Sequence, residues 1–387
     1  MKYDGLKKEQ CTGCGVCSEV CPKNCISMEY DVEGFLYPTI DETKCIDCKK
    51  CISVCHYQKK ADHPWMSDNP ICYASYGKDV SRLKEASSGG VFELLANRII
   101  DTGGIVYGAY LDQELVVRHG RATSSEGIKK FRKSKYLQSN MTGIFCFIKK
   151  DLDNQKEVLF SGTPCQVAAL YSFLGKKYNN LITVDIVCHG VPSEYVFRRY
   201  ICWVEEKYQK KVKDVCWRDK ESGWRPNHIS IVFDDRSVVS MTSNENPMQW
   251  GFLNDLYLRP SCYNCKYARI PRIGDITLGD FWGYEGELLV NNDNKGISMV
   301  VLSSKKGKEL YDQISNRVID EKSELQYCVR CSYHLTHPPK YNNKREEFMR
   351  DFVGGNVDFV SLCKEYLYDS GWPESTLLDL LELINTL

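Results

Sequence analysis

The stretch VLFSGTPCQVAAL, residues 158–170, has the pattern of a buried strand that runs through a tight turn into a helix. The same alternation of strand and helix patterns continues along the body of the chain. It is seen in residues 71–77, 89–104, 105–111, 181–188 and 193–211, and once more in residues 296–314. This rhythm predicts an α/β domain with a mixed, partly parallel sheet.

Two parts of the chain depart from this rhythm. Residues 212–242 turn to strand patterns, as in HISIVFDDRSVVSM, and predict a β insertion. Residues 59–70 are polar with two prolines and indicate a linker. We therefore expect an N-terminal domain over residues 1–58, the linker over 59–70, the main domain over 71–340 and a helical C-terminal tail over 341–387.

The N-terminal domain contains the same cysteine pattern twice. CTGCGVCSEVCP begins at Cys11 and CIDCKKCISVCH begins at Cys45, both spaced CxxCxxCxxxC. In bacterial-type ferredoxins three thiolates of one run bind a 4Fe-4S cluster, and the fourth cysteine binds the other cluster. The pattern predicts an α+β ferredoxin-like domain with two clusters. The first is bound by Cys11, Cys14, Cys17 and Cys55, and the second by Cys45, Cys48, Cys51 and Cys21.

Two zinc knuckles are the alternative, but zinc sites use CxxC pairs, and each run here is a tighter series of four cysteines. One position departs from the ferredoxin pattern, because His56 stands where a proline is expected. The ligand itself remains, so we expect both clusters. We interpret Cys25 as a core residue.

Four segments of the main domain are unlike ordinary packing sequence. SSGGVF (87–92) places hydroxyls and glycines at a helix N-terminus, which suits either an anion site or a serine N-cap. FRKSKYLQS (131–139) suits phosphates and a stacked ring, or a solvated face. GTPCQ (162–166) opens a helix whose dipole is expected to lower the pKa of Cys165. GDITLGDFWG (274–283) sets Asp275 and Asp280 among glycines, an odd composition for a buried element.

Cys165 has three possible roles. It could be a nucleophile activated by His189, a packing residue, or a cluster ligand. Cys188 and the CYNC pair lie on turns in the same domain, so the pattern favours a third iron–sulfur cluster bound by Cys165, Cys188, Cys262 and Cys265. A competing zinc site would pair Cys262 and Cys265 with Cys328 and Cys331.

The totals exclude several classes of protein. The 387 residues carry 51 basic and 51 acidic side chains, so no basic surplus indicates nucleic acid. The start MKYDGLKKEQC lacks the apolar region of a signal peptide, and no apolar run reaches the roughly 18 residues of a membrane span. Twenty cysteines in such a chain indicate reduced thiols, many of them metal ligands, and a cytoplasmic location.

The segments ASSGGVF, KSKYLQS, FSGTPCQVAAL, DIVCHGVPS, CYNCKYA and DITLGDFWG occur in order over residues 71–340. Together they resemble the coenzyme F-420 hydrogenase/dehydrogenase beta-subunit family, in its bacterial form fused to two 4Fe-4S clusters. The resemblance implies bound FAD, with an added cluster held by Cys165, Cys188, Cys262 and Cys265. The flavin contacts that it implies are Ser88, Gly89, Gly90, Lys135 and Tyr136, and Gly162, Thr163 and Asp280 are further cofactor-binding candidates.

The function expected from this resemblance is that of a flavin- and iron–sulfur-dependent oxidoreductase. Electrons would pass between a ferredoxin or other redox partner, the clusters and FAD, and on to an organic substrate or the deazaflavin F-420. Such family members often accompany exopolysaccharide biosynthesis. The alternative is a non-catalytic electron-transfer subunit that docks on a partner enzyme. A scaffold role with a degenerate flavin site is disfavoured by the intact SSGG and GTPCQ segments.

Overall fold

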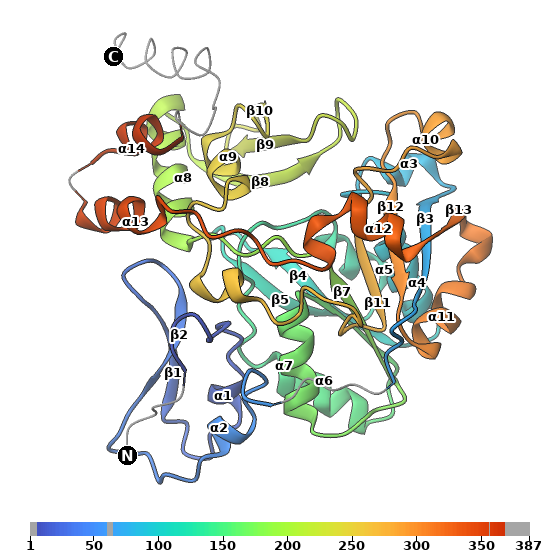
Figure 1. The fold of residues 1–387 in the computed structure, drawn as a ribbon, viewed down its shortest axis with the longest axis horizontal. Helices are drawn as coiled ribbons and strands as arrows, with labels where there is room; N and C mark the ends of the chain where they lie inside the picture. The colour runs from blue at the N-terminus through green and yellow to red at the C-terminus, as the bar shows by residue number, and fades with distance from the viewer. Residues whose placement is uncertain (1–5, 60–64, 356, 368–387) are drawn as a thin grey trace.

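The computed structural model describes residues 6–59, 65–355 and 357–367 of the chain (Figure 1). Within these residues no helix combines the length and the apolar character that crossing a membrane requires. The part of the expected linker over 60–64 and the end of the tail over 368–387 lie outside the described residues.

The N-terminal region is built from two short helices and one hairpin. Strands β1 (Ile26–Tyr30) and β2 (Leu36–Ile40) pair antiparallel, and each cysteine run leads into a short helix, α1 (Val16–Glu19) or α2 (Lys50–Ser53). Gly13 and Gly15 adopt φ of 63° and 77°, a left-handed backbone that glycine enters at little cost. This is the α+β ferredoxin-like region that the sequence predicts.

The main domain is organised around an eight-stranded sheet in the order β13-β3-β12-β11-β7-β6-β4-β5. Its strands are β3 (Ile71–Gly77), β4 (Ile105–Leu111), β5 (Val117–Ala122), β6 (Val158–Gly162), β7 (Leu181–Ile186), β11 (Ile276–Asp280), β12 (Ser298–Leu302) and β13 (Val318–Ser323). The pairs β4–β6, β6–β7 and β7–β11 are parallel, and the other four pairs are antiparallel. The expectation of a mixed, partly parallel sheet is therefore confirmed. The 274–283 segment contributes β11, inside the sheet, although its composition is unusual for a buried strand.

Helices cover both faces of this sheet. Helices α4 (Val91–Asp101) and α11 (Lys305–Asp312) share a buried core with Leu159, whereas α6 (Ile144–Asp153) and α7 (Pro164–Leu174) share another with Phe160. Successive residues of one strand point to opposite faces, so β6 supplies both cores. Shorter helices complete the domain: α3 (Val80–Leu83), α5 (Ser125–Ile128), α10 (Glu287–Asn292) and α12 (Leu325–Cys331), with the 3-10 turns η1 (Lys129–Phe131), η2 (Pro260–Asn264), η3 (Ser315–Arg317) and η4 (Tyr333–Leu335).

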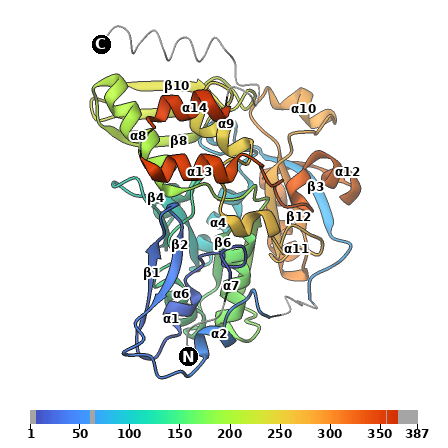
Figure 2. The same cartoon turned by 60° about the vertical axis from the view of Figure 1, so that its left-hand side comes forward.

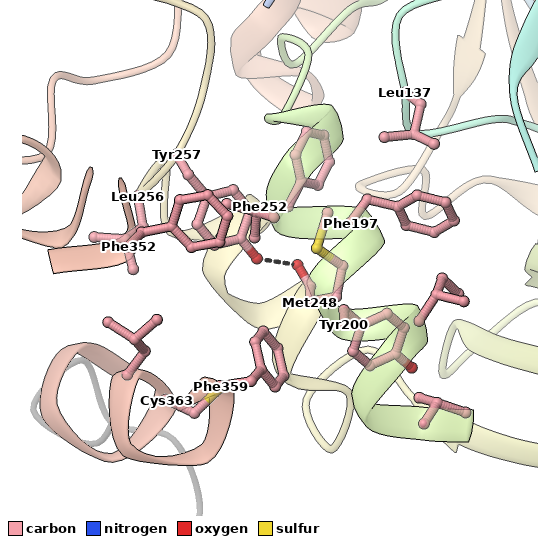
Figure 3. Close-up of a cluster of buried hydrophobic side chains, with 14 of the residues drawn as sticks. Leu137, Phe197, Tyr200, Met248, Phe252, Leu256, Tyr257, Phe352, Phe359 and Cys363 are labelled. Atoms are coloured by element: carbon pink, nitrogen blue, oxygen red, sulfur yellow. Dashed lines mark hydrogen bonds between the residues drawn. The ribbon is translucent and has the colours of Figure 1, made fainter. Parts of the chain in front are cut away.

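The β insertion forms a separate three-stranded antiparallel sheet of β8 (Val212–Asp219), β9 (His228–Phe233) and β10 (Val238–Thr242). It shares a large aromatic core with α8 (Glu194–Tyr208), α9 (Pro247–Leu253), α13 (Arg345–Gly354) and α14 (Phe359–Leu367). Figure 3 shows this core, where the Tyr257 hydroxyl donates a hydrogen bond to the carbonyl of Met248. Phe359 and Cys363 bring α14 into it, so the described part of the tail packs as an integral layer.

The N-terminal region packs directly against the main domain. Both ribbon views place α1 beside α6 and α7 (Figures 1 and 2). Val16 and Val54 are buried in the same core as Val167 of α7, and the Ser172 hydroxyl donates to the carbonyl of Val54 at 2.5 Å. This packing brings the first cysteine run close to the turn that carries Cys165.

Candidate iron–sulfur and cofactor site

The structure gathers Cys11, Cys14, Cys17 and Cys55 around one small cavity. Burial, together with the charges of Cys11 and Cys55, raises the pKa of Cys17 to about 12. Burial likewise raises the pKa of Cys14, with Cys17, Cys11 and Cys55 adding to the effect. Four thiols that repel each other as thiolates need a cation between them, and a cluster that supplies iron fits this set.

Cys21, Cys45, Cys48 and Cys51 line a second cavity of about 210 Å³. A fifth thiol shares it, because Cys25 Sγ lies 3.3 Å from Cys21 Sγ. Cys45 and Cys48 are exposed, so this set faces solvent, whereas Cys14, Cys17 and Cys55 are buried. No three metal-binding side chains of the described residues converge tightly enough to hold a single metal ion, and zinc has no ready-made site here.

The third set comes from three separate turns. Cys165 lies in the first turn of α7, Cys188 follows the end of β7, and Cys262 and Cys265 lie at η2. Burial raises the pKa of Cys188 well above its ordinary value, with further contributions from the charges of Cys262, Cys165 and Cys265. The fold therefore brings these four thiols together, as the cluster hypothesis requires.

The alternatives for Cys165 receive less support from the geometry. Burial raises the pKa of Cys165 to about 11, so desolvation outweighs the helix dipole that is expected to lower it. His189 Nε2 lies 2.7 Å from Asp255 Oδ1, a partner other than the thiol. Cys328 Sγ donates to the Ser323 hydroxyl at 3.7 Å, and Cys331 Sγ lies 3.2 Å from the carbonyl oxygen of Gly283, so both thiols have partners other than the CYNC pair.

His56 joins the first cysteine set to the main domain. Its ring is 4% exposed, with Nε2 3.0 Å from the Thr12 hydroxyl and Nδ1 hydrogen-bonded to the hydroxyl of Tyr267. Proline offers no side-chain hydrogen bond at this position. The departure from the ferredoxin pattern thus provides a polar contact between the two domains.

A cavity of about 480 Å³ lies next to the third cysteine set, and Cys188 is part of its wall. This volume is within the usual range of ligand pockets. Seven of the eight predicted cofactor-binding residues line it: Ser88, Gly90, Lys135, Tyr136, Gly162, Thr163 and Asp280. Gly89 does not. The cavity is bounded by the start of α4, the loop over residues 131–139, and the carboxyl ends of β6 and β11.

The SSGG segment fastens α4 to the sheet. The Ser88 hydroxyl donates to the carbonyl of Ile297 at 2.7 Å, and the Gly89 amide donates to the Ser298 hydroxyl at 3.0 Å. Gly90, with φ of 75°, is the N-cap residue, so the serine N-cap interpretation is wrong. The first-turn residues Val91 and Phe92 line the cavity. Because first-turn amides have no partner within their helix, this end of α4 is suited to an anion.

The basic loop contributes a desolvated cation. The Lys135 ammonium donates to the carbonyls of Arg132 at 2.6 Å and Lys133 at 3.2 Å, and burial lowers its pKa to about 7. Arg132 pairs with Glu93 at 2.7 Å. The loop is therefore part of the cavity wall, and the alternative of a solvated face is wrong.

The carboxylate of Asp280 accepts hydrogen bonds from Arg218, a residue that the sequence pattern does not indicate. Arg218, from β8 and 1% exposed, donates to Asp280 Oδ1 at 2.8 Å and to the carbonyl of Ser87 at 2.8 Å. Trp224 Nε1 donates to the same carboxylate at 2.8 Å, and its ring stacks on Trp282 at 4.6 Å. The Arg218 Nε has no hydrogen-bond partner among the described residues. No local pattern marks Arg218, because its partners lie more than fifty residues away.

His334 is a second residue that the sequence did not indicate. It lines the cavity, its ring meets that of His189 edge-on at 4.3 Å, and burial lowers its pKa to about 4. Its buried Nδ1 has no partner among the described residues. A neutral imidazole with a free ring nitrogen can accept or donate a hydrogen bond to a bound molecule.

Comparison with known proteins gives two family matches. Residues 155–326 match the family model for the C-terminal part of the coenzyme F420 hydrogenase/dehydrogenase beta subunit, and residues 10–59 match a 4Fe-4S dicluster domain. The resemblance found in the sequence is confirmed. The stretch that matches the beta subunit thus follows, in the same chain, a stretch that matches an iron–sulfur dicluster domain.

The chain is also similar to two further proteins. The chain is 24% identical over 351 residues to an uncharacterised protein of Methanocaldococcus jannaschii, covering 80% of this chain and 89% of that one. A solved chain of the F420-reducing [NiFe] hydrogenase complex from Methanosarcina barkeri is 17% identical with a TM-score of 0.48. That match covers 75% of this chain and 94% of the solved one.

Proposed function

We propose that the protein is an iron–sulfur flavoprotein oxidoreductase that passes electrons between 4Fe-4S clusters and FAD. In this proposal residues 1–58 form the ferredoxin-type domain, 59–70 the linker and 71–340 the cofactor-binding domain. The observation that carries it is the double position of Cys188, which belongs to the third thiol set and to the wall of the cavity. A redox centre held there would lie beside any molecule bound in that cavity.

An electron relay needs one centre near the surface and another beside the bound cofactor. The exposure of the three thiol sets follows this order. Cys45 and Cys48 are exposed, Cys14 is buried against the main domain, and Cys188 borders the cavity. Each set has the four thiolates that bind a four-iron cluster. The exposed set is the entry point for a ferredoxin or another redox partner.

The lining of the cavity fits FAD. Lys135 and the first turn of α4 offer positive charge to a pyrophosphate, while Phe131, Phe252 and Leu278 provide apolar surface for a ring system. A bound flavin exchanges one or two electrons and so connects single-electron clusters with hydride chemistry. Arg218 lies behind the wall, where it donates to Asp280 and to the carbonyl of Ser87 and so fixes two residues that line the cavity.

The proposal for the substrate rests on His334 and on the resemblance to the coenzyme F-420 hydrogenase/dehydrogenase beta subunit. His334 lines the cavity beside Cys188 and His189, and its Nδ1 has no hydrogen-bond partner among the described residues. We propose an organic molecule or the deazaflavin F-420 as the substrate, and a role in polysaccharide biosynthesis rests on the resemblance alone. None of the twenty cysteines, all of which lie in the described residues, forms a disulfide, and this supports a reducing compartment such as the cytoplasm.

Iron and flavin content tests the proposal. Anaerobically purified protein should contain about 12 irons, in three four-iron clusters, and one FAD per chain. Cys165→Ser should lose about four irons, whereas Cys202→Ser, at an exposed cysteine on α8, should lose none. A chain with about eight irons and no flavin would contradict the proposal. Eight irons with bound flavin would instead favour a simpler electron-transfer subunit that docks on a partner enzyme.

A further inference from the structure

Arg259 is a buried cation at the junction between the first and third thiol sets. Its side chain is 1% exposed and donates to the carbonyls of Cys11 at 2.8 Å and Leu36 at 2.7 Å. A third bond, at 3.1 Å, goes to the side-chain oxygen of Gln138. A guanidinium group of the main domain thus donates hydrogen bonds to backbone carbonyls of the N-terminal region.

The position of Arg259 is fixed from both sides. A Cβ atom added at Gly13 would lie 2.7 Å from the guanidinium, so the first cysteine run closes tightly around it. Its guanidinium lies 4.4 Å from the centre of the Tyr37 ring. On the other side, Arg259 directly precedes η2, and the amide of Cys262 donates to the Arg259 carbonyl at 2.9 Å. One cation therefore faces both thiol sets.

Arg259 differs from the other deeply buried arginines in its lack of a carboxylate. Arg218 pairs with Asp280, Arg272 with Asp185 at 3.2 Å, and Arg345 with Glu33 at 2.6 Å. No salt bridge links Arg259 to an acidic side chain in the part of the chain that the structure describes. A buried charge without a counter-charge is costly, so a negative group is needed nearby.

We propose that Arg259 is the counter-charge shared by the clusters at the first and third thiol sets, and that it keeps both of their reduction potentials high. A cysteine-bound cluster is anionic and gains negative charge when it is reduced. A buried cation therefore stabilises the reduced form, and it does so strongly where water is excluded. This inference rests on the proposed function because it requires a cluster at Cys165, Cys188, Cys262 and Cys265.

The test is a redox titration of the full-length anaerobic protein, followed by electron paramagnetic resonance. Arg259→Met should shift the one-electron reduction equilibrium of the first and third clusters at least tenfold toward the oxidised form, a fall of about 59 mV in each potential. Arg259→Lys, which keeps the charge, should recover most of the shift. The solvent-exposed second cluster should be unchanged in both variants.

Two further variants keep the test independent of folding defects. Arg345→Met removes a buried arginine whose charge Glu33 already balances, and it should leave all three potentials in place. Gln138→Glu adds a carboxylate beside the intact Arg259 and should lower the same two potentials as Arg259→Met. Unchanged potentials in Gln138→Glu and Arg259→Met, or an equal shift of all three clusters, would overturn the inference.

Failure of the proposed function has a different signature. A wild-type chain that lacks the third cluster would hold about eight irons before any substitution is made. In contrast, a chain with about 12 irons whose potentials ignore Arg259 would refute only the role of the arginine.

Discussion

Lys135 lines the cavity, and its ammonium donates hydrogen bonds to the backbone carbonyls of Lys130, Arg132 and Lys133. Burial lowers its pKa to about 7. A lysine in an unfolded chain has a pKa of about 10.4. Between about pH 7 and about pH 10.4, therefore, this lysine is protonated in the unfolded chain and neutral in the folded one. Because of this lysine, the free energy of unfolding of the ligand-free protein should increase as the pH rises from about 7 to about 10.4.

An anionic ligand beside Lys135 should reverse this effect. The ligand stabilises the charged lysine, so binding takes up a proton above about pH 7 and the affinity for FAD should fall as the pH rises. A charge-assisted hydrogen bond contributes about 1.5–3 kcal/mol, so Lys135→Met should weaken FAD binding roughly tenfold or more and remove this pH dependence. Fluorescence titration of deflavinated protein with FAD, at several pH values, measures both.

Lys220 is the matched control. Burial also lowers its pKa to about 7, but its ammonium donates to the carbonyls of Ser88 at 2.7 Å and Lys295 at 2.6 Å and does not line the cavity. Lys220→Met should keep the pH dependence of FAD binding. Equal effects of the two substitutions would show that Lys135 has no special contact with the ligand.

Single residues also show where sequence reasoning reaches its limit. The cysteine runs can be interpreted because their ligands follow a local spacing. Arg218, His334 and Arg259 cannot, since each is one polar residue in an ordinary pattern and takes its meaning from partners far along the chain. His56 stands out as a departure from the ferredoxin pattern, but its contact with Tyr267 depends on the packing of two domains.

The start of α4 illustrates how one element is fixed in place. A Cβ atom at Gly89 would lie 2.2 Å from the Ser75 carbonyl oxygen and 2.9 Å from the Ser298 amide, so β3 and β12 leave no room for a side chain. Gly89→Ala should therefore force α4 away from the sheet. We expect a destabilisation of about 1–3 kcal/mol, seen as a lower midpoint of thermal unfolding, together with loss of bound flavin.

Gly354 provides the comparison for that substitution. It lies in α13, and an added Cβ atom would meet nothing within 4 Å. Gly354→Ala should leave stability unchanged or raise it by up to about 1 kcal/mol, with full flavin content. A Gly89→Ala protein as stable as Gly354→Ala would contradict the packing described for the SSGG segment.

The alternation of strand and helix patterns is sufficient to predict the sheet and its parallel part. It cannot give the strand order, because β11, β12, β3 and β13 pair over sequence separations of up to 251 residues, as between Ser323 and Cys72. The local composition does not indicate that β11 is a buried strand. Its polar end, at Asp280, lines the cavity. Elements that carry a site can break the pattern of a buried strand.

In the whole molecule, the two domains share one continuous core. Val16 and Val54 of the N-terminal region are buried with Val167 of the main domain (Figure 2). This packing fixes the separation between the first and third thiol sets. The two parts match separate family models, and the packing joins them in one core.

The most direct test of the relay is the rate at which the bound flavin is reduced by a reduced ferredoxin, a donor too large to enter the cavity. When the wild-type protein is mixed with an excess of reduced ferredoxin, all of its bound flavin should become reduced. Cys188→Ser, reconstituted with FAD, should slow this reduction at least a hundredfold while the clusters in residues 10–59 are still reduced. Equal rates of flavin reduction in the two proteins would contradict the account.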